Sequence, residues 1–64
     1  MKRTHFLEYL HKYRIQKAKE YLHNKLLKNY EVSRMVGYTN EKYFSQMFKR
    51  YTGLTPTQYK DSIL

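Results

Sequence analysis

The chain has 64 residues, of which 13 are Lys or Arg and 5 are Asp or Glu, so its formal net charge is +8 at pH 7. A chain of this length buries only about 60% of its unfolded surface, which excludes two domains and disfavours an enzyme with a deep cleft. The lack of cysteine excludes disulfides and thiolate metal sites. Because no apolar stretch could span a membrane, we expect a soluble, cytoplasmic protein whose charge attracts polyanions, nucleic acid first.

The chain has one proline, two glycines and no β-branched run that would favour a strand, which predicts an all-α fold. The first helix is predicted over about Thr4 to His23, where apolar residues recur at helical spacing. Its apolar arc is roughly twice the ~100° that one packing partner requires. One side carries Leu7, Leu10, Ile15, Ala18, Tyr21 and Leu22, and another carries Phe6, Tyr9 and Tyr13. Such a helix is expected to pack against neighbours on both sides.

A connection follows the first helix, and Leu26 and Leu27 are expected to pack inward from it. The second helix is predicted over about Tyr30 to Val36. Asn29 is the expected N-cap, because a short polar side chain can accept a hydrogen bond from the first helical turn.

A three-residue turn, Gly37-Tyr38-Thr39, separates the second helix from the third. Gly37 can adopt the positive φ that ends a helix. Asn40 is the expected N-cap of a helix over about Glu41 to Tyr51, and Gly53 is expected to end it. Two helices joined by a short glycine turn form the helix-turn-helix arrangement.

The last predicted helix runs over about Pro56 to Ser62. Thr55 and Gln58 have the spacing of a capping box, and proline is favoured at the first helical position. The fold class is therefore a small, homeodomain-like, three-helix unit over residues 29–64. It is preceded by a long linker helix and connection over residues 1–28, and the whole forms a single domain.

The predicted third helix has two chemically different sides. One side is apolar and carries Phe44, Met47, Phe48 and Tyr51. The opposite side carries Lys42, Gln46 and Lys49, with Ser45, Tyr43 and Arg50 on its flanks. A helix of this kind suits the major groove, because Lys can donate to guanine and Gln can bond adenine. The same pattern is also typical of an amphipathic helix whose polar side simply meets water.

These motifs resemble the C-terminal signature of AraC/XylS-type transcriptional regulators. The resemblance rests on the segments Val36-Gly37-Tyr38, Tyr43-Phe44-Ser45, Phe48-Lys49, Thr52-Gly53, Thr55-Pro56 and Tyr59. Upstream, Tyr9-Leu10, Arg14-Ile15, Ala18 and Leu22 resemble the linker helix of that family. The family most often has Ala at the position of Ser33, whose hydroxyl is expected to bond back along its own helix.

The resemblance implies double-stranded DNA as the partner and a role in bacterial transcription regulation. The family's DNA-binding unit has two helix-turn-helix subdomains, of which this chain matches the linker helix and the second. The chain is therefore expected to be a fragment whose parent adds the first subdomain and a sensor or receiver domain. The same module ends many two-component response regulators.

The resemblance also implies which residues contact DNA. The implied base contacts are Glu41, Lys42, Ser45 and Gln46, of which the helix pattern independently selects the last three. Expected backbone contacts are Thr39, Asn40, Lys49, Arg50 and Thr57, which lie at helix N-termini or along the third helix. Tyr43 has two open interpretations, a DNA contact or a surface residue.

The charge is distributed unevenly between the two segments. Residues 1–28 contain eight basic and two acidic residues, net +6, whereas residues 29–64 contain five and three, net +2. Most of the excess therefore lies on the linker segment, where it can attract DNA or simply be solvated. Arg14 is expected to be structural, its stem covering the apolar arc.

An alternative function is a protein-interaction or self-association module. Its surface would be the Phe6, Tyr9 and Tyr13 side of the first helix, or the side with Leu7, Ala18 and Leu22. Binding to a membrane surface is disfavoured, because the caps and tyrosines suit a globular core. His5, His11 and His23 share no helical face, so no metal site, cofactor or catalytic set is expected.

Overall fold

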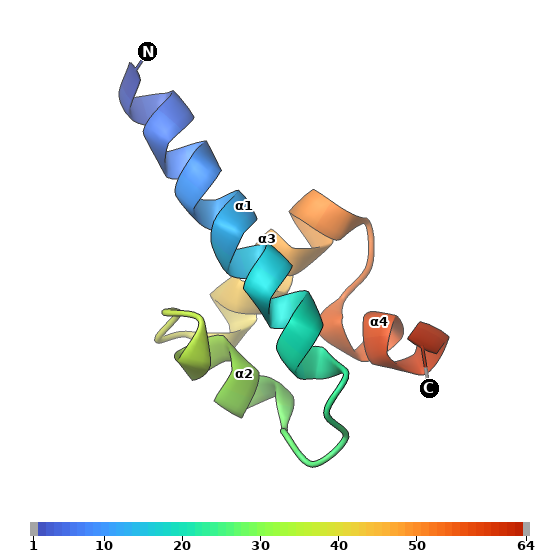
Figure 1. The fold of residues 1–64 in the computed structure, drawn as a ribbon. Coiled ribbons are helices and arrows are strands. Elements are labelled where there is room, and N and C mark those ends of the chain that lie inside the picture. The colour runs from blue at the N-terminus through green and yellow to red at the C-terminus, as the bar shows by residue number, and fades with distance from the viewer. Residues whose placement is uncertain (1, 64) are drawn as a thin grey trace.

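A computed structural model describes the backbone of residues 2–63 and the side chains of residues 7–63, and all regular structure in that range is helical. The four helices are α1 (Lys2–Leu22), α2 (Asn29–Met35), α3 (Glu41–Thr52) and α4 (Pro56–Ile63). Figure 1 shows the N-terminal half of α1 projecting beyond the other helices, while its C-terminal half crosses them. The predicted all-α fold is confirmed. None of the helices within residues 2–63 is both long and apolar enough to cross a membrane.

The core lies where α1, α2 and α3 meet, and α4 closes one side of it. Buried apolar side chains come from all three helices and the turn: Ile15, Ala18, Leu22, Val32, Val36, Tyr38, Phe44 and Phe48. Tyr59 of α4 packs edge-on against Phe48, with ring centroids 5.5 Å apart. The predicted apolar side of the third helix is therefore the side that faces the core.

The turn between α2 and α3 is fixed by two hydrogen bonds between the same pair of residues. Gly37 has a φ of 99°, a conformation that residues with a Cβ rarely adopt. The Tyr38 N–H donates to the Ser33 carbonyl oxygen at 2.9 Å. The Ser33 hydroxyl, which is buried, donates to the Tyr38 carbonyl oxygen at 3.3 Å. The expected bond of Ser33 back along its helix was wrong, because the turn brings the Tyr38 carbonyl oxygen within reach of the hydroxyl.

The N-terminus of α2 differs from the prediction, because Lys28 and not Asn29 occupies the N-cap position. Lys28 has extended backbone angles, and its N–H donates to Glu31 Oε1 at 2.8 Å. Asn29 lies one residue inside the helix and donates from Nδ2 to Thr57 Oγ1 at 3.0 Å. The short polar side chain therefore joins the N-termini of α2 and α4 instead of capping its own helix.

The connection between α1 and α2 holds only one of its two leucines against the core. Leu27 packs there, whereas Leu26 is 88% exposed. The Leu26 N–H donates to Asn24 Oδ1 at 2.9 Å, which forms a tight local turn. Lys60 of α4 donates to the Leu27 carbonyl oxygen at 2.8 Å and fixes the connection from the other side. The expected inward packing of Leu26 was wrong.

The ends of α3 and α4 agree with the sequence predictions. Asn40 Oδ1 accepts from the Tyr43 N–H at 3.0 Å, as an N-cap does. Gly53 ends α3 with a φ of 86°. Thr55 and Gln58 form the predicted capping box, with reciprocal bonds of 2.9 and 3.1 Å.

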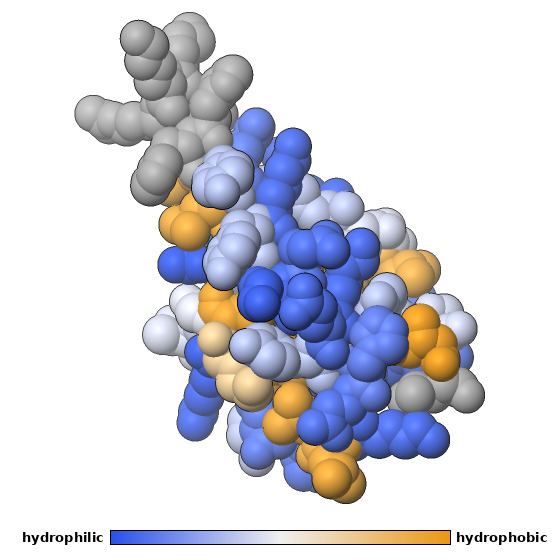
Figure 2. All heavy atoms as spheres, viewed as in Figure 1, coloured by the Kyte–Doolittle hydropathy of each residue, from blue (hydrophilic) through white to orange (hydrophobic). Residues whose placement is uncertain are grey.

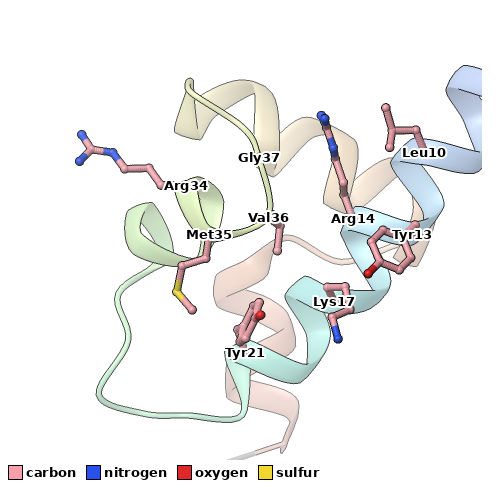
Figure 3. Close-up of a pocket in the computed structure, with 9 residues that line it drawn as sticks. All are labelled: Leu10, Tyr13, Arg14, Lys17, Tyr21, Arg34, Met35, Val36 and Gly37. Atoms are coloured by element: carbon pink, nitrogen blue, oxygen red, sulfur yellow. The ribbon is translucent and has the colours of Figure 1, made fainter.

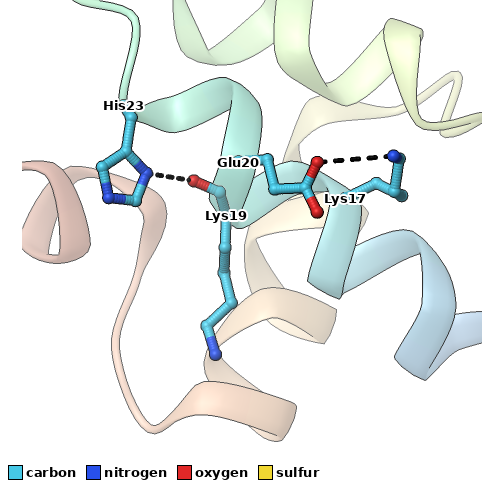
Figure 4. Close-up of polar contacts among 4 residues, drawn as sticks. All are labelled: Lys17, Lys19, Glu20 and His23. Atoms are coloured by element: carbon cyan, nitrogen blue, oxygen red, sulfur yellow. Dashed lines mark hydrogen bonds and ion pairs between the residues drawn. The ribbon is translucent and has the colours of Figure 1, made fainter.

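The last turn of α1 carries its own local contacts (Figure 4). His23 Nδ1 lies 2.8 Å from the Lys19 carbonyl oxygen, so its N–H satisfies one of the free carbonyls at the end of the helix. Lys17 Nζ and Glu20 Oε1 are 3.3 Å apart. This hydrogen bond and the charge of Glu20 raise the pKa of Lys17.

Candidate nucleic-acid interface

The two sides of α3 have opposite environments. Phe44 and Phe48 form its inner face, and both are completely buried. Lys42, Gln46 and Lys49 lie on the opposite side and are exposed, and we call these three residues the outer face. The outer face carries two positive charges and one amide and no carboxylate. This face can therefore enter a groove of a polyanion without bringing a carboxylate out of water and close to the phosphates.

The remaining predicted base contacts, Glu41 and Ser45, flank the outer face. Glu41 is exposed in the first turn of α3, where the helix dipole favours an acidic side chain. Ser45 is half-buried, so it presents less of its side chain to a ligand than Gln46 does. The structure therefore brings the four predicted base contacts to one side of one helix, with Lys42 and Gln46 the most prominent.

The expected backbone contacts lie around this helix. Thr39 and Asn40 are exposed just before α3, and Arg50 is exposed farther along it. Asn40 uses its carbonyl oxygen to cap α3, so its amide N–H groups remain for a phosphate oxygen. Thr57 is exposed at the N-terminus of α4 and accepts the bond from Asn29. Its hydroxyl hydrogen is thus left to donate outward.

Tyr43 belongs to a cluster of rings that joins α1, the turn and α3. It is 45% exposed and packs edge-on against His11 and Tyr38, with centroids 6.2 and 5.8 Å apart. His11 also stacks on Tyr51 at 6.3 Å. Tyr43 therefore has a structural role through one edge of its ring, while the rest of the ring faces solvent.

His11 joins α1 to the turn, a role that the sequence analysis missed. Its Nδ1 lies 2.7 Å from the Tyr38 hydroxyl, and the two rings stack. Burial lowers the pKa of His11, and the charges of Arg14 and Arg50 lower it further, so the neutral imidazole is favoured. Burial raises the pKa of Tyr38. Helical spacing could have indicated this role, since His11 precedes Ile15 by four residues and Ala18 by seven.

Arg14 closes the same region from the other side of α1. Its guanidinium lies 5.4 Å from the centre of the Tyr38 ring. A Cβ added at Gly37 would lie 3.3 Å from the Cζ atom of Arg14. The structural role expected for Arg14 agrees with this position. Within residues 7–63, no group of three or more histidine and carboxylate side chains is placed to hold a metal ion.

The comparisons with known proteins identify the family. A family described as "Helix-turn-helix domain" matches residues 2–62. The chain is 37% identical over 54 residues to an uncharacterized HTH-type transcriptional regulator, YpdC, of Escherichia coli (strain K12). This match covers 84% of the chain but only 19% of that relative. No solved structure matches the chain significantly. With the glycine turn, the capped α3 and its polar outer face, these matches show that the chain belongs to the AraC-type helix-turn-helix family of DNA-binding domains.

Proposed function

We propose that this domain binds double-stranded DNA by inserting α3 into one major groove. The observation that carries the proposal is the division of α3 into an inner face that is completely buried and an outer face without carboxylates. The capped N-terminus of α3 adds free backbone N–H groups and the positive end of the helix dipole, both of which favour phosphate. The relative named as a transcriptional regulator supports a role in transcription regulation.

We assign the base contacts to Lys42 and Gln46, with Glu41 and Ser45 at the margins of the same surface. Lys can donate to guanine O6 and N7, and Gln can bond adenine N6 and N7. Thr39, Asn40, Lys49, Arg50 and Thr57 are assigned to the phosphate backbone, where they fix the register of α3 without selecting a sequence.

The parent of this domain is proposed to be a bacterial regulator in the cytoplasm, with a further DNA-binding subdomain and a sensor or receiver domain. The chain spans about a fifth of the relative that it matches. One module contacts few base pairs, and most of its affinity comes from salt-dependent phosphate contacts. We therefore expect weak binding by the isolated domain, and a second groove contact in the intact regulator.

The test is selection of bound sequences from random duplex DNA with the full-length parent, repeated with Gln46→Ala and Lys42→Ala. Each lost bidentate contact should reduce discrimination at one base position by about 1–3 kcal/mol. Lys12→Ala is the matched control, because Lys12 is exposed on α1. An unchanged preference in both α3 variants would refute the base-contact assignment.

A second candidate function is self-association through the exposed apolar residues of α1. Leu7, Tyr9 and Tyr13 are 51%, 70% and 56% exposed there, which favours an interaction surface. The side with Ala18 and Leu22 is not available, because both residues are buried in the core. The side chain of Phe6 lies outside the described residues. Sedimentation of the isolated chain tests this function, and a monomer at high concentration would contradict it.

A further inference from the structure

His11 of α1 lies beside the proposed recognition helix. Its ring packs edge-on against Tyr43 and stacks on Tyr51, and both of these tyrosines belong to α3. Tyr43, Gln46 and Arg50 follow one another along α3 at spacings of three and four residues, so they share one side of the helix. Because His11 contacts the first residue of this row, the α1 ring adjoins the surface that carries Gln46.

The contact with Tyr38 fixes which nitrogen of His11 carries the proton. Nδ1 of His11 lies 2.7 Å from the Tyr38 hydroxyl, which has no other acceptor for its hydrogen among residues 7–63. Burial raises the pKa of Tyr38, so the hydroxyl keeps that hydrogen. A proton on Nδ1 would leave the hydrogen of this buried tyrosine without an acceptor, which is unfavourable. Tyr38 therefore donates to Nδ1, and neutral His11 carries its proton on Nε2.

Nε2 of His11 faces solvent. Among the buried and half-buried residues in the range 7–63, Asn29 Oδ1 is the one side-chain nitrogen or oxygen that is both enclosed and without a hydrogen bond. His11 is half-buried, and its Nε2 has no bond to another residue of that range, so Nε2 is open to solvent. The ring thus presents an N–H donor outward, while Tyr38 and the α3 tyrosines hold its other side.

The charges that act on His11 are positive. Burial lowers its pKa, the charges of Arg14 and Arg50 lower it further, and no carboxylate is among the groups that shift it. Figure 3 shows Arg14 extending from α1 beside the turn at Gly37, where it also lies over the Tyr38 ring. Arg50 is exposed on α3. The charged and titratable groups near the ring are Arg14 and, one turn earlier, the exposed Glu8 of α1, Tyr38 of the turn, and Tyr43, Arg50 and Tyr51 of α3.

We propose that His11 binds a backbone phosphate of the DNA through Nε2, as a contact from α1 beside Arg50. The inference rests on the proposed insertion of α3 into the major groove. That groove is about 12 Å wide, close to the diameter of a helix, so the margins of an inserted helix meet the phosphates that border it. An outward N–H donor in a positive region at this margin suits a phosphate oxygen.

The contact has a consequence for protonation. A phosphate beside the ring opposes the charges of Arg14 and Arg50, so the bound complex favours the imidazolium more than the free domain does. DNA binding and proton uptake by His11 are therefore linked, and binding should strengthen as the pH falls. A residue that only packs α1 against the turn would show no such linkage.

The first experiment follows the ring signals of His11 by NMR over a range of pH. The 64-residue chain is measured free and saturated with a duplex of the sequence selected by the full-length parent. We expect DNA to raise the pKa of His11 by about one pH unit, which corresponds to as much as tenfold tighter binding at low pH. His23, at the other end of α1, is the internal control, and its pKa should change by less than half as much. This measurement needs no variant.

The second experiment compares two substitutions at the same position. His11→Asn keeps a polar atom near Nδ1 for Tyr38 but has none in place of Nε2, whereas His11→Gln can place an amide N–H near Nε2. At about pH 7.5, His11→Asn should weaken DNA binding roughly tenfold, and His11→Gln should remain within about threefold of the original chain. His23→Asn is the matched control and should stay within about twofold. Circular dichroism checks that each variant is folded.

The salt dependence of binding gives a further readout. Between about pH 7.5 and 5.5, the salt slope of the original chain should steepen by up to about one unit, because an imidazolium adds one cationic contact. The slope of His11→Asn should steepen less. Equal losses in His11→Asn and His11→Gln would make His11 a packing residue and overturn the proposal.

The same measurements separate this proposal from the DNA proposal. Amide shifts along α3 without a change in the pKa of His11 would overturn the phosphate contact and leave the insertion of α3 standing. The absence of both DNA binding and α3 shifts would overturn the two proposals together.

Discussion

The inner and outer faces of α3 share one helix but carry separate tasks. The inner face is two phenylalanines without any exposed surface, and the outer face is two lysines and a glutamine in contact with solvent. Substitutions on the inner face should change stability, while those on the outer face should change binding alone. In a domain of this size, the same short helix supplies a large part of the core and all of the proposed base contacts. Figure 2 shows a surface on which hydrophilic groups predominate and hydrophobic groups are scattered.

The largest expected effect is the loss of stability caused by a substitution on the inner face. Phe48→Ala removes a completely buried ring that packs against Phe44 and Tyr59. We expect a loss of about 3–5 kcal/mol in the free energy of unfolding, enough to unfold so small a domain. Urea unfolding followed by circular dichroism measures this loss, and Gln46→Ala is the matched control on the same helix. A folded, cooperative Phe48→Ala protein would show that the inner face is not essential.

The next largest effect acts on the turn that orients both faces. Gly37→Ala forces a residue with a Cβ to adopt a φ of 99°, at a cost of about 1–3 kcal/mol. Gly53→Ala is the control for backbone strain alone, because a Cβ there would meet nothing within 4 Å. Thermal unfolding measures the loss of stability in both variants. If the two losses are equal, the contact of the added Cβ at position 37 with Arg14 makes no contribution to the loss.

A smaller effect is expected on the outer face. Lys49→Ala removes one of the proposed phosphate contacts, so affinity for every DNA sequence should fall alike, and the salt slope should decrease by about one unit. Fluorescence anisotropy at several salt concentrations measures this slope. The free energy of unfolding should change by less than about 0.5 kcal/mol. A change of preference at a single base would instead make Lys49 a base contact.

The smallest expected effect is a pH dependence at His11, which joins α1 to the turn and to the tyrosines of α3. The folded state lowers the pKa of His11 below its ordinary value of 6.5. As the pH falls through about 6.5, the unfolded state therefore takes up the proton first, and stability decreases until the folded state is also protonated. Unfolding midpoints at about pH 7.5 and 5.5 measure the decrease. His11→Gln should reduce it, and an unchanged pH dependence in that variant would contradict this role.

The sequence predicts the local features of this domain better than its long-range polar contacts. Helix ends at Asn40, Gly53 and Thr55 depend on short spacings and on φ preferences, which can be identified from the residues alone. The two sides of α3 follow from helical periodicity in the same way. All of these features arise from neighbours within about four residues.

The features that the sequence analysis missed join residues far apart in the chain. The bond from Asn29 to Thr57 spans 28 residues, and the contact of His11 with Tyr38 spans 27. Asn29 has the chemistry of an N-cap, and only the position of α4 shows why it does not act as one.

The paired bonds between Ser33 and Tyr38 have a consequence for the energetics of association. Because both backbone and side chain close the turn, the angle between α2 and α3 is fixed before any ligand arrives. If the domain binds DNA as proposed, we expect little loss of backbone entropy, and the ordering cost should fall mainly on the long side chains of Lys42, Gln46 and Lys49. Amide hydrogen exchange at Tyr38 should consequently be as slow as in the core helices. We therefore expect the turn to keep its conformation when the domain binds DNA, so that ordering on binding is confined to side chains.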